Sequence, residues 1–117
     1  MSLPTSVDQP TRREEAALTK LRITVLKRMH FPDLQSEYAK AGTFDVCTAF
    51  EDGQVFETAE AKPDGFCSWA WADIQRDVTL VRSGAEFPWI GPKNTMISCC
   101  TDGFRPVIFK IERVGRE

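Results

Sequence analysis

Alternating apolar and polar positions predict strands near both ends of the chain. In residues 21–26 apolar side chains recur at every second position, which is the side-chain period of a strand. Residues 96–100 and 106–113 predict two further strands, joined by a Thr-Asp-Gly turn. The last of these strands has one continuous apolar face, so we expect it to lie against a core.

Residues 44–58 have the pattern of a β-hairpin. Side chains alternate along 44–50, Asp52 and Gly53 supply the turn, and residues 55–56 lie on the return arm. The alternating residues of the first arm are Phe44, Val46, Thr48 and Phe50.

Two helices are predicted between these strands. Pro32 suits the first position of a short helix, and Gly42 is its natural stop. A longer helix begins near Ser68, which can cap it, and ends near Ser83, with Gly84 after it. The buried stripe of this longer helix is expected to consist of Trp71, Ile74, Val78 and Val81.

This mixture of strands, helices and hairpin turns indicates the α+β class. We expect a single small domain with a mainly antiparallel sheet and two helices, spanning residues 20–117. Residues 1–19 carry two prolines, a cluster of charges and little apolar content, so we expect a flexible N-terminal tail there.

Size and charge narrow the function classes. The chain has 117 residues and a net charge of −2, which suits one domain and speaks against a dedicated nucleic-acid binder. Its longest apolar run is four residues, far too short to span a membrane. The N-terminal residues lack the apolar stretch of a secretory signal, so we expect a cytoplasmic protein with reduced thiols.

The turn near the end of the chain holds the densest group of reactive residue types. Cys99 and Cys100 are adjacent, so their side chains would point to opposite faces of an extended strand. The guanidinium of Arg105 favours the thiolate of a nearby cysteine, whereas a close Asp102 opposes that effect. We therefore predict a reactive thiolate or an anion-binding turn at these residues. In the structural alternative, Asp102 and Gly103 form a tight turn and Arg105 pairs with Asp102.

Cys67 is a second candidate nucleophile, because it falls at the N-terminus of the longer predicted helix. Unpaired N–H groups and the helix dipole stabilise a thiolate there, although a buried cysteine can also act as an apolar filler. Trp69 and Trp71 are two positions apart, so they cannot both lie on the buried stripe. We expect one of them to line a groove, a subunit contact or the loop that contains Trp89, with core packing as the alternative.

A metal site is a further hypothesis, with Zn²⁺ or an iron–sulfur cluster as the cofactor that thiolate ligands favour. His30 or Asp102 could complete the ligand set. The chain contains no Cys-x-x-Cys, so the spacing gives this site no support. The candidate metal ligands are Cys47, Cys67, Cys99 and Cys100.

Two blocks of the sequence carry a family resemblance. Residues 65–74 read GFCSWAWADI, and residues 99–113 read CCTDGFRPVIFKIER. These blocks resemble the patterns GFCxWAWxDI and CCxDGxRPVxFxxxR of a family of short uncharacterised prokaryotic proteins. The resemblance covers about residues 20–113, including the segment around Cys47 and the Phe-Pro-Trp sequence at 87–89. It implies a fold boundary and a motif, with no activity attached.

Three functional hypotheses follow. The protein is a thiolate enzyme or redox protein centred on Cys67 or Cys100, with Arg105 as the group that stabilises an anion or thiolate. Alternatively it is a thiolate metal-binding protein, or a non-catalytic module that binds a small ligand or forms oligomers. The high aromatic content favours self-association, and we predict a homo-oligomer, with a dimer favoured.

Overall fold

The computed structural model describes residues 20–41 and 45–115, and they form an α+β domain. Its elements are β1 (Lys20–Arg28), α2 (Pro32–Tyr38), β2 (Val55–Thr58), α3 (Ser68–Arg82), β3 (Thr95–Cys99) and β4 (Val107–Gly115). The expected N-terminal tail, the start of the predicted hairpin at Phe44 and the helix stop at Gly42 lie outside the described residues.

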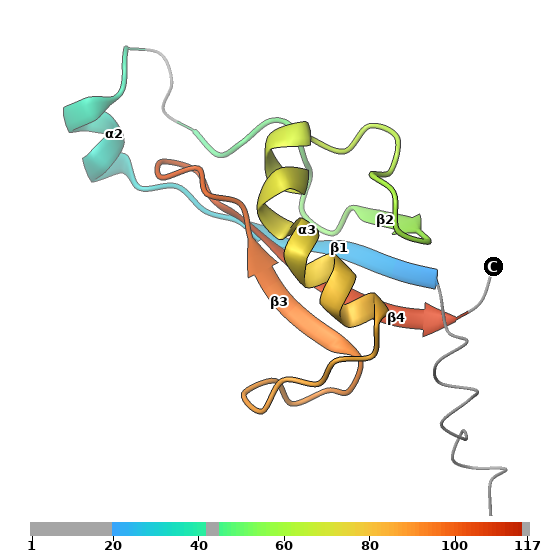
Figure 1. Cartoon of the computed structure of the whole chain (residues 1–117). Helices are drawn as coiled ribbons and strands as arrows, with labels where there is room; N and C mark the ends of the chain where they lie inside the picture. The colour runs from blue at the N-terminus through green and yellow to red at the C-terminus, as the bar shows by residue number, and fades with distance from the viewer. Residues whose placement is uncertain (1–19, 42–44, 116–117) are drawn as a thin grey trace, which may run out of the picture.

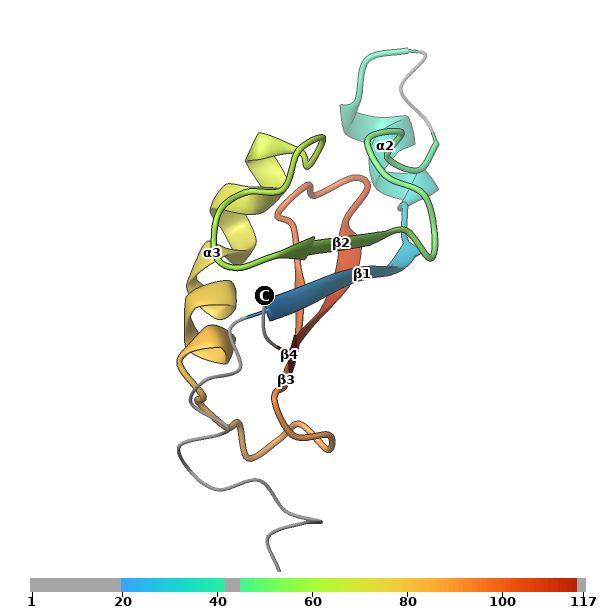
Figure 2. The same cartoon turned by 90° about the vertical axis from the view of Figure 1, so that its right-hand side faces the viewer.

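The four strands form one antiparallel sheet in the order β2-β1-β4-β3 (Figure 1). The two longest strands, β1 and β4, are central, and α3 crosses one face of the sheet. Turned by 90°, the molecule shows α3 along one side of the sheet, while α2 stands apart beyond one end of β1 (Figure 2). The predicted fold class, an α+β domain with a mainly antiparallel sheet and two helices, is confirmed.

The core lies between α3 and the sheet. Alternate residues of β1 and β4 are fully buried there, as their two-residue period predicts. The sheet contributes Leu21, Ile23, Val25, Val107, Phe109 and Ile111 to the core, and α3 contributes Ala70, Ile74, Val78 and Val81. The predicted stripe of α3 is therefore largely correct, although Trp71 at its start is only partly buried.

The predicted hairpin over residues 44–58 is wrong for its described part. Residues 45–50 form no strand, and β2 pairs instead with β1. At the turn, Gly53 N–H donates to the Val25 carbonyl and Val25 N–H donates to the Gln54 carbonyl, each at 2.8 Å. The guanidinium of Arg28 takes the place of a strand partner for part of 45–50, because its Nη1 donates to the carbonyls of Cys47 and Phe50. Phe50 is buried. Its apolar side chain therefore reflects a contact with the core, and its backbone does not pair as a strand.

The helix boundaries agree with the sequence except at two points. Helix α2 has Pro32 in its first turn, and it ends at Tyr38, earlier than Gly42 would require. At the start of α3 the N-cap is Cys67, not Ser68, and its side chain makes no capping hydrogen bond. Helix α3 ends at Arg82, and Gly84 follows with φ +91°. No helix in residues 20–41 or 45–115 combines the length and the apolar character needed to cross a membrane.

Candidate functional site

A cavity of about 540 Å³ lies where three segments of the chain meet. Its walls come from residues 47–50, from Cys67, Trp69 and Ala70 at the start of α3, and from the β3–β4 turn at residues 100–105. These segments are distant in sequence. The fold brings them together because α3 packs against β3 and β4, which places its first turn beside their connecting turn.

The four residues predicted as a catalytic group all line this cavity: Cys67, Cys100, Asp102 and Arg105. Cys47 also lines it, although the sequence had suggested this residue only as a metal ligand. The fourth cysteine, Cys99, does not contribute to the walls and is exposed. The structure thus places three cysteines from separate segments around one cavity, and Cys99 outside its walls.

Cys67 occupies the N-cap position of the 15-residue helix α3 and is partly buried. Its carbonyl accepts the Trp71 N–H at 2.9 Å, which is the first hydrogen bond of the helix. The N–H groups of the first turn have no partner within the helix, and they carry the positive end of its dipole. The Cys67 side chain lies at this end of the helix and makes no capping hydrogen bond to these groups.

Cys100 lies in the wall between the cavity and the core, with 7% of its surface exposed. It extends the pairing of β3 with β4, since its N–H donates to the Val107 carbonyl at 3.2 Å. Its Sγ accepts the Val107 N–H at 3.4 Å. This sulfur is therefore engaged with the backbone and largely shielded from solvent.

Cys99 points to the other face of the sheet, as strand alternation predicts. Its pairing partner is Ile108, on the side away from α3. Partial burial raises the pKa of the Cys99 thiol, and charge repulsion from Cys100 and from the carboxylate of Asp73 adds to the effect. Cys99 is the one exposed cysteine among the described residues. Its raised pKa disfavours the thiolate form.

Asp102 and Arg105 form a compact turn at the cavity wall. One carboxylate oxygen of Asp102 accepts the N–H groups of Phe104, at 2.9 Å, and Arg105, at 3.1 Å. The other oxygen accepts Nε of Arg105 at 3.4 Å. The pairing expected in the structural alternative is thus present, and it links the guanidinium to the turn beside the cavity.

A hydrogen-bond chain that was not predicted from the sequence ties α3 to this turn. The Trp69 indole N–H donates to the Thr101 hydroxyl at 3.1 Å, and that hydroxyl donates to Asp73 at 2.9 Å. One turn further along the helix, Ser98 donates to the buried Asp77 at 2.7 Å. Trp69, Asp73 and Asp77 follow one another at intervals of four residues, so the helical period could have revealed this polar stripe.

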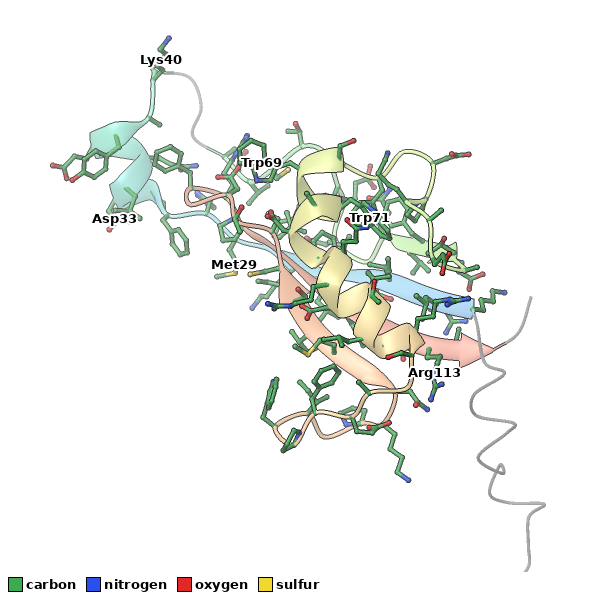
Figure 3. The ribbon with its side chains drawn as sticks, in the orientation of Figure 1. Met29, Asp33, Lys40, Trp69, Trp71 and Arg113 are labelled. Carbon is green, nitrogen blue, oxygen red and sulfur yellow. The ribbon has the colours of Figure 1, made fainter. Side chains whose placement is uncertain are left out.

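The two tryptophans at the start of α3 lie on opposite sides of the helix (Figure 3). Trp69 is 67% exposed and lines the cavity, whereas Trp71 packs edge-on against Phe66 with ring centres 5.7 Å apart. The expected division of roles between them is therefore present, with Trp69 as the residue that faces the groove.

The proposed metal ligands do not form a ligand set. Within the part of the chain that the structure describes, no group of three His, Cys, Asp or Glu side chains is arranged to hold a metal ion. Cys99 points away from the cavity that Cys47, Cys67 and Cys100 share. His30 contacts Gln35 at 3.4 Å and lies outside the cavity walls.

Comparisons with known proteins found no match for this chain. No family model, curated protein or solved structure matches the chain. The resemblance of residues 65–74 and 99–113 to a prokaryotic family therefore stays a prediction from the motif alone.

Proposed function

We propose that the protein carries out thiol chemistry on a small molecule, with Cys67 as the nucleophile in the cavity described above. One observation carries this proposal. A single cavity is lined by Cys67, Cys100 and Arg105, which come from separate parts of the sequence. A concave site with a few convergent polar groups on mostly apolar walls is the usual form of a small-molecule site.

Cys67 is a better nucleophile than Cys100 on geometric grounds. Its sulfur is partly exposed and stands at the positive end of α3, while the sulfur of Cys100 is shielded and accepts a backbone N–H. In this proposal Cys100 shapes the wall, and Arg105 supplies the positive charge that Asp102 fixes in place.

The proposed reaction is a nucleophilic substitution at a carbon atom of the bound molecule. The Cys67 thiol first loses its proton to water, and the thiolate then donates an electron pair to an electrophilic carbon of the bound molecule. The bond from that carbon to its leaving group breaks, and the leaving group departs with the electron pair. No electron acceptor is needed.

Thiol titration of the native protein tests this proposal. A chromogenic disulfide reagent should react rapidly with a single thiol per chain, by attack of the thiolate on the reagent's sulfur and release of its aromatic thiolate. The fast phase should disappear in Cys67→Ser and remain in the matched variants Cys47→Ser and Cys99→Ser. A fast phase that survives in Cys67→Ser would contradict the proposal.

A redox role is a second candidate, because three cysteines from separate segments line the same cavity. In thiol–disulfide exchange, one of them would attack an external disulfide and a second would resolve the mixed disulfide. Incubation with oxidised glutathione followed by non-reducing peptide mapping distinguishes the two functions. A disulfide between two of Cys47, Cys67 and Cys100 would support the redox role, and a stable mixed disulfide at Cys67 alone would support the nucleophile.

Self-association and location remain proposals. We infer a homodimer from the aromatic content of the chain, and light scattering should give a mass twice that of the 13.2 kDa chain. A monomeric mass would contradict it. A cytoplasmic location fits a function that depends on reduced cysteines, and fractionation of cells that produce the protein tests it.

A further inference from the structure

The cavity has an uneven distribution of charge. Among the described residues that line it, Arg105 is the one side chain with a permanent positive charge, and Asp102 is the one carboxylate. Both lie in the β3–β4 turn. A ligand therefore meets charged side chains on that segment and none among the lining residues of the other two segments.

The carboxylate of Asp102 is already committed within its own turn. It accepts the backbone N–H groups of Phe104 and Arg105 and the Nε of Arg105. No described residue accepts a hydrogen bond from the two Nη nitrogens of Arg105. A guanidinium anchored through Nε presents these nitrogens as a rigid fork, which matches the two oxygens of a carboxylate.

Apart from Thr48, the other polar side chains of the walls are occupied, and the rest of the lining consists of apolar, cysteine and glycine residues. The Trp69 indole N–H and the Thr101 hydroxyl bind each other, and that hydroxyl also binds Asp73. The remaining wall includes the aromatic and small apolar side chains of Ala49, Phe50, Ala70 and Phe104. Such walls bind an apolar or flat ligand body by burial of surface and by aromatic contact.

We propose that the ligand is a small monocarboxylic acid with an aromatic or bulky apolar body. Its carboxylate binds the Nη nitrogens of Arg105, and its body packs against Trp69 and the partly buried Phe104, beside Cys67. This inference rests on the proposed function, because it names the class of molecule that Cys67 would meet. A phosphate dianion fits less well, since Asp102 lies beside Arg105 and no second cation lines the cavity.

Calorimetric titration of the full chain with three matched probes tests the ligand class. The probes are 3-phenylpropionate, its neutral amide 3-phenylpropionamide, and phenyl phosphate. We expect the acid to bind about tenfold more tightly than the amide, as a charge-assisted bidentate pair predicts. Phenyl phosphate should bind more weakly than the acid.

Two variants of Arg105 test whether its Nη nitrogens cause the preference for the acid over the amide. Arg105→Gln should remove the preference for acid over amide without weakening the amide, and Arg105→Lys should keep only part of it. The control is Arg76→Gln, because Arg76 is 81% exposed on α3 and does not line the cavity. Equal affinity for acid and amide, tighter binding of the phosphate, an unchanged preference in Arg105→Gln, or no acid binding at about 10 mM would each overturn the inference.

The same titration on Cys67→Ser separates this inference from the proposed function. The acid preference should survive in that variant, because the carboxylate site does not include the sulfur. An unreactive Cys67 together with an Arg105-dependent preference would refute the nucleophile and leave the ligand class standing. A reactive Cys67 without any preference for the acid would refute the ligand class and leave the nucleophile standing.

Discussion

One carboxylate oxygen of Asp73 accepts two hydrogen bonds from Thr101, from its backbone N–H at 2.8 Å and from its hydroxyl at 2.9 Å. Asp73 belongs to α3, which also carries Cys67 at its N-cap, and Thr101 begins the turn that carries Arg105. This contact fastens the two halves of the candidate site to each other, and it gives Asp73 a positioning role.

Asp73→Asn should lower stability and disturb the cavity. An amide oxygen without charge replaces an oxygen that accepts two hydrogen bonds, so we expect a loss of about 1–2 kcal/mol in the free energy of unfolding. Urea denaturation measures it. Asp64→Asn is the matched control, because Asp64 is exposed in a loop, and its stability should match that of the wild type. An unchanged stability of Asp73→Asn would show that the contact does not fasten the site.

Trp69 and Trp89 offer a second matched pair, since they are 67% and 69% exposed. Only Trp69 of the two lines the cavity. Trp69→Phe should weaken the binding of 3-phenylpropionate several-fold and leave stability within about 1 kcal/mol of the wild type. Trp89→Phe should change neither quantity. Calorimetric titration checks the affinities, and a loss of affinity in Trp89→Phe would place the ligand elsewhere.

Gly84→Ala should be more destabilising than Gly53→Ala. Both glycines have positive φ, at +91° and +82°, which costs a residue with a Cβ roughly 1–2 kcal/mol. At Gly84 the added Cβ would also lie 3.3 Å from Nη1 of Arg113, whose Nη2 is held by Asn94 at 2.7 Å. No atom lies within 4 Å of a Cβ at Gly53. Equal unfolding midpoints for the two variants would show that Arg113 yields without cost.

Glu57 makes stability depend on pH in the acidic range. Hydrogen bonds from Lys20 and Arg22 hold the pKa of Glu57 below its ordinary value of 4.5. The folded state therefore gains stability above pH 4.5 that is lost as the pH falls through the lowered pKa.

Glu57→Gln should consequently lose less stability on acidification than the wild type does. The difference should be small and should shrink with added salt, because the residue is exposed. Urea midpoints measured at neutral pH and below the lowered pKa test this. Glu37→Gln, a change at an exposed position of α2, should leave the wild-type dependence intact. Equal losses in Glu57→Gln and the wild type would contradict the assignment.

Much of the fold could be predicted because local sequence patterns indicate its strands, its helices and their buried faces. The two-residue period of β1 and β4 and the helical stripe at Ile74 and Val78 match the burial in the structure. The same reasoning failed at residues 45–50. A buried Phe50 looks the same in sequence whether its backbone pairs with a strand or with a side chain such as Arg28. Sequence alternation reports which side chains are buried and says little about hydrogen-bond partners.

The candidate site could be predicted only in part. Reactive residue types pointed to Cys67, Cys100, Asp102 and Arg105, and all four line the cavity. The supporting contact between Asp73 and Thr101 was missed, because it joins positions 28 residues apart. Its geometry depends on how α3 crosses the sheet, which no local pattern of the sequence contains.

Site-resolved alkylation of the native wild-type chain tests the central claim most directly. The chain is treated briefly with iodoacetamide at neutral pH, and mass spectrometry follows each cysteine separately. Cys67, at the start of α3, should be modified about tenfold faster than the more accessible Cys99, whose raised pKa keeps it protonated. A rate at Cys99 that equals or exceeds the rate at Cys67 would contradict the account.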